Sequence, residues 1–235
     1  QVAETHKIVG AISVQPVCNC RFNMLNPTGN IPWAPEVTGQ HHYDPQSIGN
    51  ISWRHPAGNN LLFEAVYSDL RVTQQTTRQP TTGNAVQVTD VGMNYRYGSR
   101  GLNLGATGSY FIIPRWQMTP GFNVSYVTGR HSFKSGVLAR YFHTGNSALN
   151  DDPNQINQGR SYTFNNGVPT AVQIWAVPFA WEESGRDLSF YAQDQWTLGR
   201  TTVNLGLRYN DTSTSIEESH LAAGFFVPER TIAAL

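Results

Sequence analysis

The chain has 235 residues, of which only 14% are Asp, Glu, Lys or Arg and 11% are aromatic, so fixed charge is scarce compared with the roughly 25% of a typical soluble domain. Basic and acidic residues both number 16, and this balance argues against nucleic acid or an anionic lipid surface as the partner. No run of about 18 apolar residues occurs, which excludes an ordinary transmembrane helix but not membrane-spanning strands of about 9–11 residues.

The two ends of the sequence do not look like natural boundaries. The chain begins QVAETHKIV, without a basic region, an apolar region or a cleavage site for export, and it ends TIAAL directly after the loop-like stretch FFVPER. We therefore expect an internal piece of a longer polypeptide. On this view the missing export signal is no evidence for the cytoplasm.

A weak strand pattern over 7–14 is followed by a long polar segment that contains the two cysteines. Cys18 and Cys20 could chelate a soft metal, and His41 and His42 lie in the same segment. The spacing matches no common zinc pattern, and an oxidising compartment would instead favour a disulfide or inert thiols. Both alternatives stay open, with the second favoured.

The next segments read as strands joined by turns. A hairpin is predicted over 49–74, with its turn at PAGNN (56–60). A further strand is predicted where Val91, Met93, Tyr95 and Tyr97 alternate with Gly92, Asn94 and Arg96. The stretch 102–113 is a weaker candidate.

The clearest alternation in the chain runs from Trp116 to Tyr126. Trp116, Met118, Pro120, Phe122, Val124 and Tyr126 share one side, while Gln117, Thr119, Gly121, Asn123 and Ser125 share the other. After the turn TGRH (128–131), a second strand places Phe133, Val137, Ala139 and Tyr141 on its apolar side. Leu138 on the polar side and Ser135 on the apolar side are exceptions.

A long polar segment then precedes two weaker strand candidates, 159–165 and 170–177. Asp151, Asp152 and Asn154 within it offer oxygen atoms for calcium, but without the spacing of an EF-hand loop. A solvated turn is the favoured interpretation.

A third hairpin covers 188–210. Leu188, Phe190, Ala192 and Trp196 share one side of its first strand, with Asp194 as the exception, and Val203, Leu205, Leu207 and Tyr209 share one side of its second. Leu198-Gly199-Arg200 supplies the tight turn. No segment has convincing helical periodicity.

The connections alternate between three short turns and long polar loops, which is typical of a transmembrane barrel with short turns at one end and long loops at the other. Aromatic residues near strand ends, such as Trp116 and Tyr209, suit a membrane interface. We predict an all-β fold: part of an antiparallel up-and-down transmembrane β-barrel, with roughly ten strands. The alternative is a soluble β-sandwich, in which two apolar faces pack on each other.

Several phrases together resemble the barrel of TonB-dependent outer-membrane receptors. They are DLSFYAQDQWTLGRTTVNLGLRYN, YTFNNGVPT, VSYVTGRHSFKSG, SWRHPAGNNLLFEA and FVPER, and the set is most similar to the Oar-like group. The resemblance implies a receptor in the outer membrane of a bacterium, coupled to the TonB system of the inner membrane and taking up an unidentified extracellular ligand. The sequence contains no plug domain, TonB box or regulatory-like domain, so residues 1–235 correspond to barrel alone.

If the chain is a barrel wall, its inward face carries the candidate binding residues. They are Glu64, Arg96, Lys134, Arg140, Gln193 and Arg208, together with Gln195 and Asn204. A solvated wall without a specific ligand is the simpler interpretation. No nucleophile, metalloprotease or nucleotide-binding motif occurs, so we expect neither enzymatic activity nor a cofactor. The partners that the resemblance implies are membrane lipid, a plug and the TonB system. A soluble adhesion module and a passive porin are the alternative functions.

Overall fold

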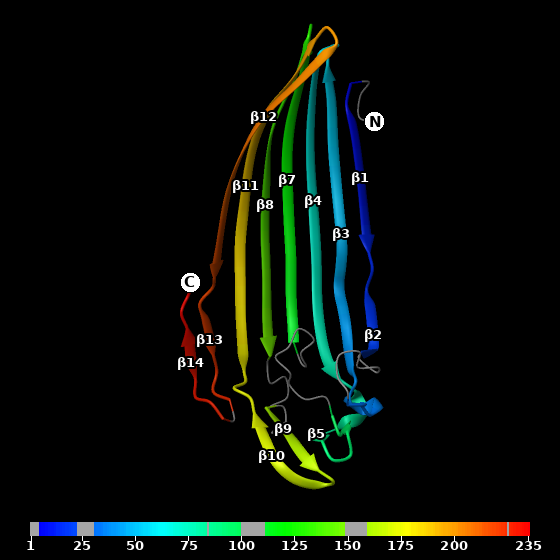
Figure 1. Cartoon of the computed structure of the whole chain (residues 1–235), viewed down its shortest axis with the longest axis vertical. Helices are drawn as coiled ribbons and strands as arrows, with labels where there is room; N and C mark the ends of the chain where they lie inside the picture. Colours follow the sequence, from blue (N-terminus) through cyan, green and yellow to red (C-terminus); the bar gives the residue numbers. More distant parts are fainter. Residues whose placement is uncertain (1–4, 23–30, 84, 100–110, 149–158, 225) are drawn as a thin grey trace.

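In a computed structural model, the chain forms one long, twisted antiparallel sheet and two smaller sheets (Figure 1). The structure describes residues 5–22, 31–83, 85–99, 111–148, 159–224 and 226–235. The main sheet has the strand order β1-β3-β4-β7-β8-β11-β12, and β2 extends it beside β3. Every pair in this sheet is antiparallel, which confirms the up-and-down topology predicted from the sequence.

The main sheet contains most of the described residues. Its strands are β1 (Lys7–Val14), β2 (Val17–Phe22), β3 (Gly39–Ala57), β4 (Leu61–Arg78), β7 (Phe111–Thr128), β8 (His131–Ala148), β11 (Phe179–Leu198) and β12 (Thr201–Ile216). A four-stranded loop sheet consists of β5 (Gln87–Asp90), β6 (Tyr95–Tyr97), β9 (Arg160–Asn165) and β10 (Val168–Ile174), and a two-stranded sheet of β13 (Ser219–Leu221) and β14 (Arg230–Ile232). Two 3-10 turns, η1 (Pro35–Val37) and η2 (Pro80–Thr82), precede β3 and β5.

The register of the main sheet separates its side chains into an apolar face and a polar face. Phe190 pairs with Val137 on β8 and with Tyr209 on β12, and Val137 pairs with Phe122 on β7. Because paired residues point to the same side of a sheet, the apolar halves of the three predicted hairpins combine into one surface. The apolar face carries Ile51, Phe63, Trp116, Phe122, Tyr126, Phe133, Val137, Tyr141, Leu188, Phe190, Trp196, Val203, Leu205, Leu207 and Tyr209.

Two of the exceptions to the predicted alternation, Asp194 and Leu138, have local partners. Asp194, on the apolar face, accepts a hydrogen bond from His131 Nδ1 at 2.7 Å. Leu138, on the polar face, fills the space beside Gly121, where an added Cβ would lie 2.9 Å from Leu138 Cδ1. Each residue is therefore accommodated without a change of register.

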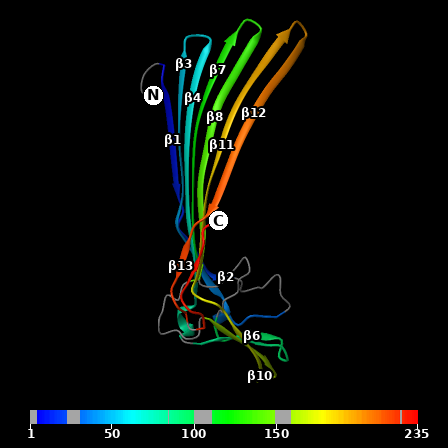
Figure 2. The ribbon, with the colours of Figure 1, turned by 90° about the vertical axis from the view of Figure 1, so that its left-hand side faces the viewer.

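The three short turns lie at one end of the main sheet, which we call the turn end (Figures 1 and 2). Gly129-Arg130 and Gly199-Arg200 are two-residue turns, and the glycines have φ of 56° and 61°. A positive φ at the first turn residue matches the twist of the flanking strands and favours glycine. The opposite end, the loop end, carries the long connections and the loop sheet.

The prediction that the strand around Val91 and Tyr97 belongs to the wall was wrong. Residues 91–94 form a turn, in which Met93 N donates to Asp90 Oδ1 at 2.9 Å and Asn94 has φ of 49°. Only β6 is a strand, and it lies in the loop sheet with β9 and β10. Among the described residues the wall consequently has eight strands, where roughly ten were predicted. The candidates within 102–110 and 151–154 lie outside the described residues.

Hardly any apolar side chain is buried in the described part of the chain. The four buried apolar residues there are Ala34, Val37, Val177 and Leu221, whereas Leu205 and Leu207 are 65% and 79% exposed. Neither face of the described main sheet is covered by a second sheet (Figures 1 and 2). The structure therefore does not have the packed interior that the sandwich alternative requires.

No helix among the described residues is both long enough and apolar enough to span a membrane.

Candidate functional site

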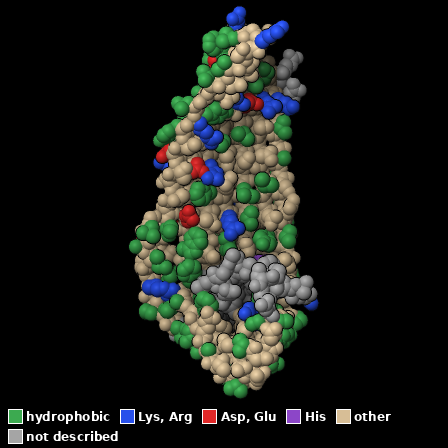
Figure 3. All heavy atoms as spheres, in the orientation of Figure 1, with side chains coloured by type: hydrophobic (Ala, Val, Ile, Leu, Met, Phe, Trp, Pro, Cys, Tyr) green, Lys and Arg blue, Asp and Glu red, His purple; other side chains and the backbone are tan. Residues whose placement is uncertain are grey.

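The polar face of the main sheet is the candidate site (Figure 3). The strands bring five of the six predicted residues to this face: Glu64 on β4, Lys134 and Arg140 on β8, Gln193 on β11, and Arg208 on β12. Pairing of Gln193 with Lys134, and of Tyr191 with Arg208, fixes their relative positions. The pairing of the strands, and not the loops, therefore positions the side chains of this site.

Glu64 is the acidic centre of a small charge cluster near the turn end. Its Oε1 lies 2.9 Å from Arg54 Nε, and its Oε2 lies 3.9 Å from Lys134 Nζ. Arg54 pairs with Glu64 across β3 and β4, whereas Lys134 reaches it from β8, across β7. Both cations are partly exposed, so the cluster can still interact with solvent or a solute.

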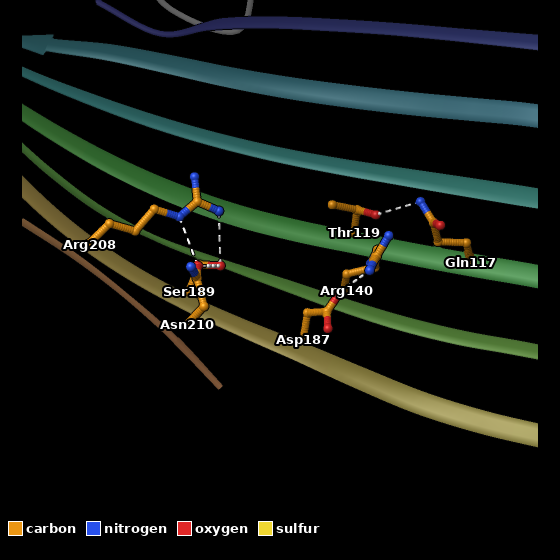
Figure 4. Close-up of polar contacts among 7 residues, drawn as sticks. All are labelled: Gln117, Thr119, Arg140, Asp187, Ser189, Arg208 and Asn210. Carbon is orange, nitrogen blue, oxygen red and sulfur yellow. Dashed lines mark hydrogen bonds and ion pairs between the residues drawn. The ribbon is translucent and has the colours of Figure 1, made fainter. Parts of the chain in front are cut away.

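Arg140 forms the second charged contact, an ion pair with Asp187 on the adjacent strand β11 (Figure 4). In the same view, Gln117 Nε2 donates to Thr119 Oγ1 at 3.3 Å on β7. Asp187 was not predicted from the sequence, because a charged residue before the hairpin pattern carries no signal of its cross-strand partner.

Arg208 is held by neutral groups. Its Nε donates to Asn210 Oδ1 at 2.8 Å and its Nη2 donates to Ser189 Oγ at 3.1 Å, while Ser189 Oγ donates to the same Asn210 oxygen at 2.8 Å (Figure 4). These bonds orient the guanidinium without neutralising its charge. A positive group held in this way can bind an acidic or carbonyl group of a solute.

Tyr191 connects β11 to β7 across the intervening strand. Its hydroxyl donates to Asn123 Oδ1 at 2.7 Å, passing over Gly136 of β8. A Cβ at position 136 would lie 2.2 Å from Asn123 Oδ1 and 2.8 Å from Tyr191 Cε1, so only glycine leaves room for this bond. Nearby, Lys134, Gln193, Gln195 and Asn204 line part of an open pocket of about 400 Å³.

We expect Gly136→Ala to destabilise the folded protein, because the added methyl group clashes with Asn123, Tyr191 and the Phe122 carbonyl oxygen. Overpacking of this kind costs roughly 1–3 kcal/mol. Urea unfolding of the protein in detergent micelles measures the loss. Gly206→Ala is the matched control, because its Cβ would meet its nearest neighbour, Gln193 Cβ, at 3.4 Å. Equal stabilities of the two variants would contradict the role given to Gly136.

Arg96 does not lie on the polar face, which corrects the sixth predicted position. It belongs to β6 in the loop sheet, where its guanidinium lies 5.1 Å from the centre of the Trp33 ring and its Nε donates to Thr89 Oγ1 at 3.0 Å. Burial lowers the pKa of Arg96 from its ordinary value. The alternation that predicted a wall strand covers the turn at 91–94 and the three residues of β6.

Cys18 and Cys20 form a disulfide on β2, so in this state neither sulfur is a thiolate ligand. His42 lies beside them, with Nε2 3.9 Å from Cys18 Sγ. His41 is buried, and its Nδ1 lies 3.2 Å from Gln74 Nε2. The structure therefore separates the two histidines into different surroundings.

The apolar face has the dimensions of a membrane-spanning band. Residues 116 to 126 of β7 extend about 33 Å along the strand, which at a tilt of about 40° is a band ~25 Å tall. Charged pairs occur on this face close to its loop-end border, level with Trp116 and Met118, where Arg71 Nε lies 2.9 Å from Asp69 Oδ1 and Arg186 lies 3.9 Å from Asp211. Because β11 and β8 have 20 and 18 residues, their remaining length projects past this band at the loop end.

Aromatic and histidine rings stack on the apolar face toward the turn end. His131 stacks on Trp196 at 5.4 Å, and His6 stacks on His55 at 4.1 Å. Such rings have an apolar body and a polar edge, and suit the boundary between lipid and water.

Comparisons with known proteins agree with this geometry. The sequence profile of a family described as "Outer membrane beta barrel domain" matches residues 1–232. The fold is similar to the crystal structure of the outer membrane transporter YddB from Escherichia coli, with a TM-score of 0.50 and 10% sequence identity, covering 92% of this chain and 27% of that one. The chain thus spans about a quarter of the length of that transporter. No curated protein sequence matches the chain.

Proposed function

Because the chain belongs to the outer membrane beta barrel domain family and lies in the bacterial outer membrane, we propose that it forms part of the wall of a TonB-dependent, Oar-like receptor that takes up a polar solute. The observation that carries the proposal is the two-faced main sheet. Its apolar face fits lipid, and its polar face carries side chains held by cross-strand hydrogen bonds and ion pairs.

The polar face suits contact with a solute or a plug better than it suits catalysis. Glu64 and Asp194 are the carboxylates that could suggest an acid and base pair, but they lie on opposite faces of the sheet, and each has a basic partner. We therefore propose a transport role without bond-making chemistry. The remaining strands, the plug and the TonB-coupling segment of the receptor would come from parts of the protein outside residues 1–235.

The test separates an energy-coupled receptor from a passive porin. The intact protein is reconstituted in a planar lipid bilayer, and the current carried by KCl is recorded. A plugged receptor is expected to show no steady open conductance. After purification, a chemical cross-linker should join it to the periplasmic domain of TonB. A large, stable conductance without TonB cross-linking would favour the porin and overturn the proposal.

A further inference from the structure

A cluster of His143, Glu182, Ser184 and Glu217 lies on the lipid-side face of the main sheet, at the loop-end border of the apolar band, where His143 pairs with Trp116. Pairing of His143 with Ser184, and of Glu182 with Gly145, brings β8 and β11 together here. Glu217 directly follows β12, and its backbone N–H donates to the Glu182 carbonyl oxygen at 2.9 Å. The cluster therefore marks the point where β12 leaves the sheet.

The hydrogen bonds assign the tautomer of His143. Glu217 Oε1 accepts a hydrogen bond from Ser184 Oγ at 2.7 Å, so the hydroxyl hydrogen is used there. The same Oγ lies 3.1 Å from His143 Nδ1 and must accept, which makes Nδ1 the protonated nitrogen. In the neutral imidazole, Nε2 then carries the lone pair.

This lone pair faces a second acceptor. Glu182 Oε2 lies 3.8 Å from His143 Nε2, and in the neutral ring there is no hydrogen between them. The ring itself is largely enclosed, with a side chain 14% exposed and Trp116 stacked on it at 5.9 Å. A lone pair and a carboxylate that converge in this way are the arrangement that a cation would fill.

We propose that His143 Nε2, Glu182 and Glu217 bind a divalent first-row metal ion such as Zn²⁺. One donor atom from each residue lies within 4.8 Å of the others, and ligands around a tetrahedral zinc ion are about 3.3 Å apart. Glu182 already faces Nε2, whereas Glu217 Oε1 lies on the other side of the ring, 3.9 Å from Nδ1, so Glu217 has to change rotamer and give up its hydrogen bond from Ser184 to reach the ion. Both carboxylates are about half exposed, which leaves room for that change. Ser184, which accepts from Nδ1, orients the ring as the outer partner of a metal-bound histidine usually does.

The proposed ion would fasten three strands, β8, β11 and β12, at the outer border of the membrane band. Its role is separate from solute uptake, because it lies on the opposite face of the sheet from Arg140 and Arg208. Imidazole with carboxylates favours zinc-like ions over magnesium, which prefers oxygen ligands alone.

The site is tested by isothermal titration calorimetry, in which zinc is added to the intact, chelator-treated protein in detergent. We expect one bound equivalent that millimolar Mg²⁺ does not displace, and an affinity at least roughly tenfold lower in His143→Gln and Glu182→Gln. His220→Gln is the matched control, because His220 also faces a glutamate, with Nε2 3.0 Å from Glu218 Oε1, and belongs to no such three-residue cluster in the described chain.

A second readout does not depend on affinity. Bound Zn²⁺ should slow hydrogen exchange at residues 214–217 in the wild type and have no effect there in His143→Gln. Equal zinc binding by the wild type and His143→Gln, displacement by Mg²⁺, or no binding at all would each overturn the proposal.

Discussion

Replacing Asp90 by alanine is expected to break the connection between the turn at 91–94 and the β9–β10 turn of the loop sheet. Asp90 is fully buried, and its carboxylate accepts backbone hydrogen bonds from Met93 N and Asn166 N at 2.9 Å, from Gly167 N at 2.7 Å, and from Gly92 N. Asn166 and Gly167 form the β9–β10 turn, so this one side chain joins two loops far apart in sequence. Alanine leaves these amide groups without their acceptor, and their hydrogen exchange should accelerate roughly tenfold to a hundredfold.

Asp90→Asn is the control that separates charge from shape. It retains one carbonyl oxygen but places an amide NH₂ group where a second oxygen accepted a hydrogen bond, so we expect an intermediate acceleration. The hydrogen bonds within the main sheet at Phe190 and Val137 should keep their protection in both variants. If exchange at residues 166 and 167 were unchanged in Asp90→Ala, the joining role would be wrong.

The same carboxylate predicts how the loop sheet responds to acid. Burial raises the pKa of Asp90, but the hydrogen bonds from Met93, Gly167, Asn166 and Gly92 outweigh it, and the pKa is lower than that of an ordinary aspartate. The stabilisation is therefore present above the unfolded pKa of about 3.9 and is lost as the pH falls through the lower folded value. Protection at residues 166 and 167, corrected for intrinsic exchange, should be constant from pH 7 to about 5 and decline only below about 4.

The alternation of side chains was sufficient to predict the wall of the barrel. Phe122 and Val137 were placed on the apolar side of one predicted hairpin and Phe190 on the apolar side of another, and the register joins them on one surface. A period of two depends only on the local backbone, and burying one face in lipid enforces it along each strand. The three short turns could also be predicted from the sequence, because glycine marks the positions that need a positive φ.

The loop sheet and the contacts of the polar face could not be predicted in this way. The turn at Val91–Asn94 depends on Asp90 being buried by β9, about 70 residues later in the chain. Local alternation of side chains cannot predict this long-range contact. Likewise, the bond from Tyr191 to Asn123 depends on a glycine at the matching position of a third strand. Gly136 was the one available signal, and it becomes informative only after the register is known.

A lysine in place of Leu207 should destabilise the protein strongly, because this position lies near the middle of the apolar band. Leu207 pairs with Ala192, midway between Trp196 and Leu188 on β11, and it is 79% exposed on the face that contacts lipid. A lysine at the bilayer midplane costs roughly 2–4 kcal/mol, and near the interface only about 0–1 kcal/mol. Reversible unfolding in lipid vesicles by guanidinium chloride measures the difference in the free energy of unfolding.

Two controls on the same strand make the result specific to the orientation of the sheet. Val203→Lys keeps the apolar face but moves the charge next to the turn at Gly199, where lysine can reach water, so its cost should be small. Asn204→Lys places the charge on the polar face beside the pocket that Lys134 and Gln195 also line, and should be tolerated. If Leu207→Lys cost no more than Asn204→Lys, the two faces would have been assigned the wrong way round. The solute would then have to be sought against the aromatic side of the wall, because a barrel can expose only one of its faces to lipid.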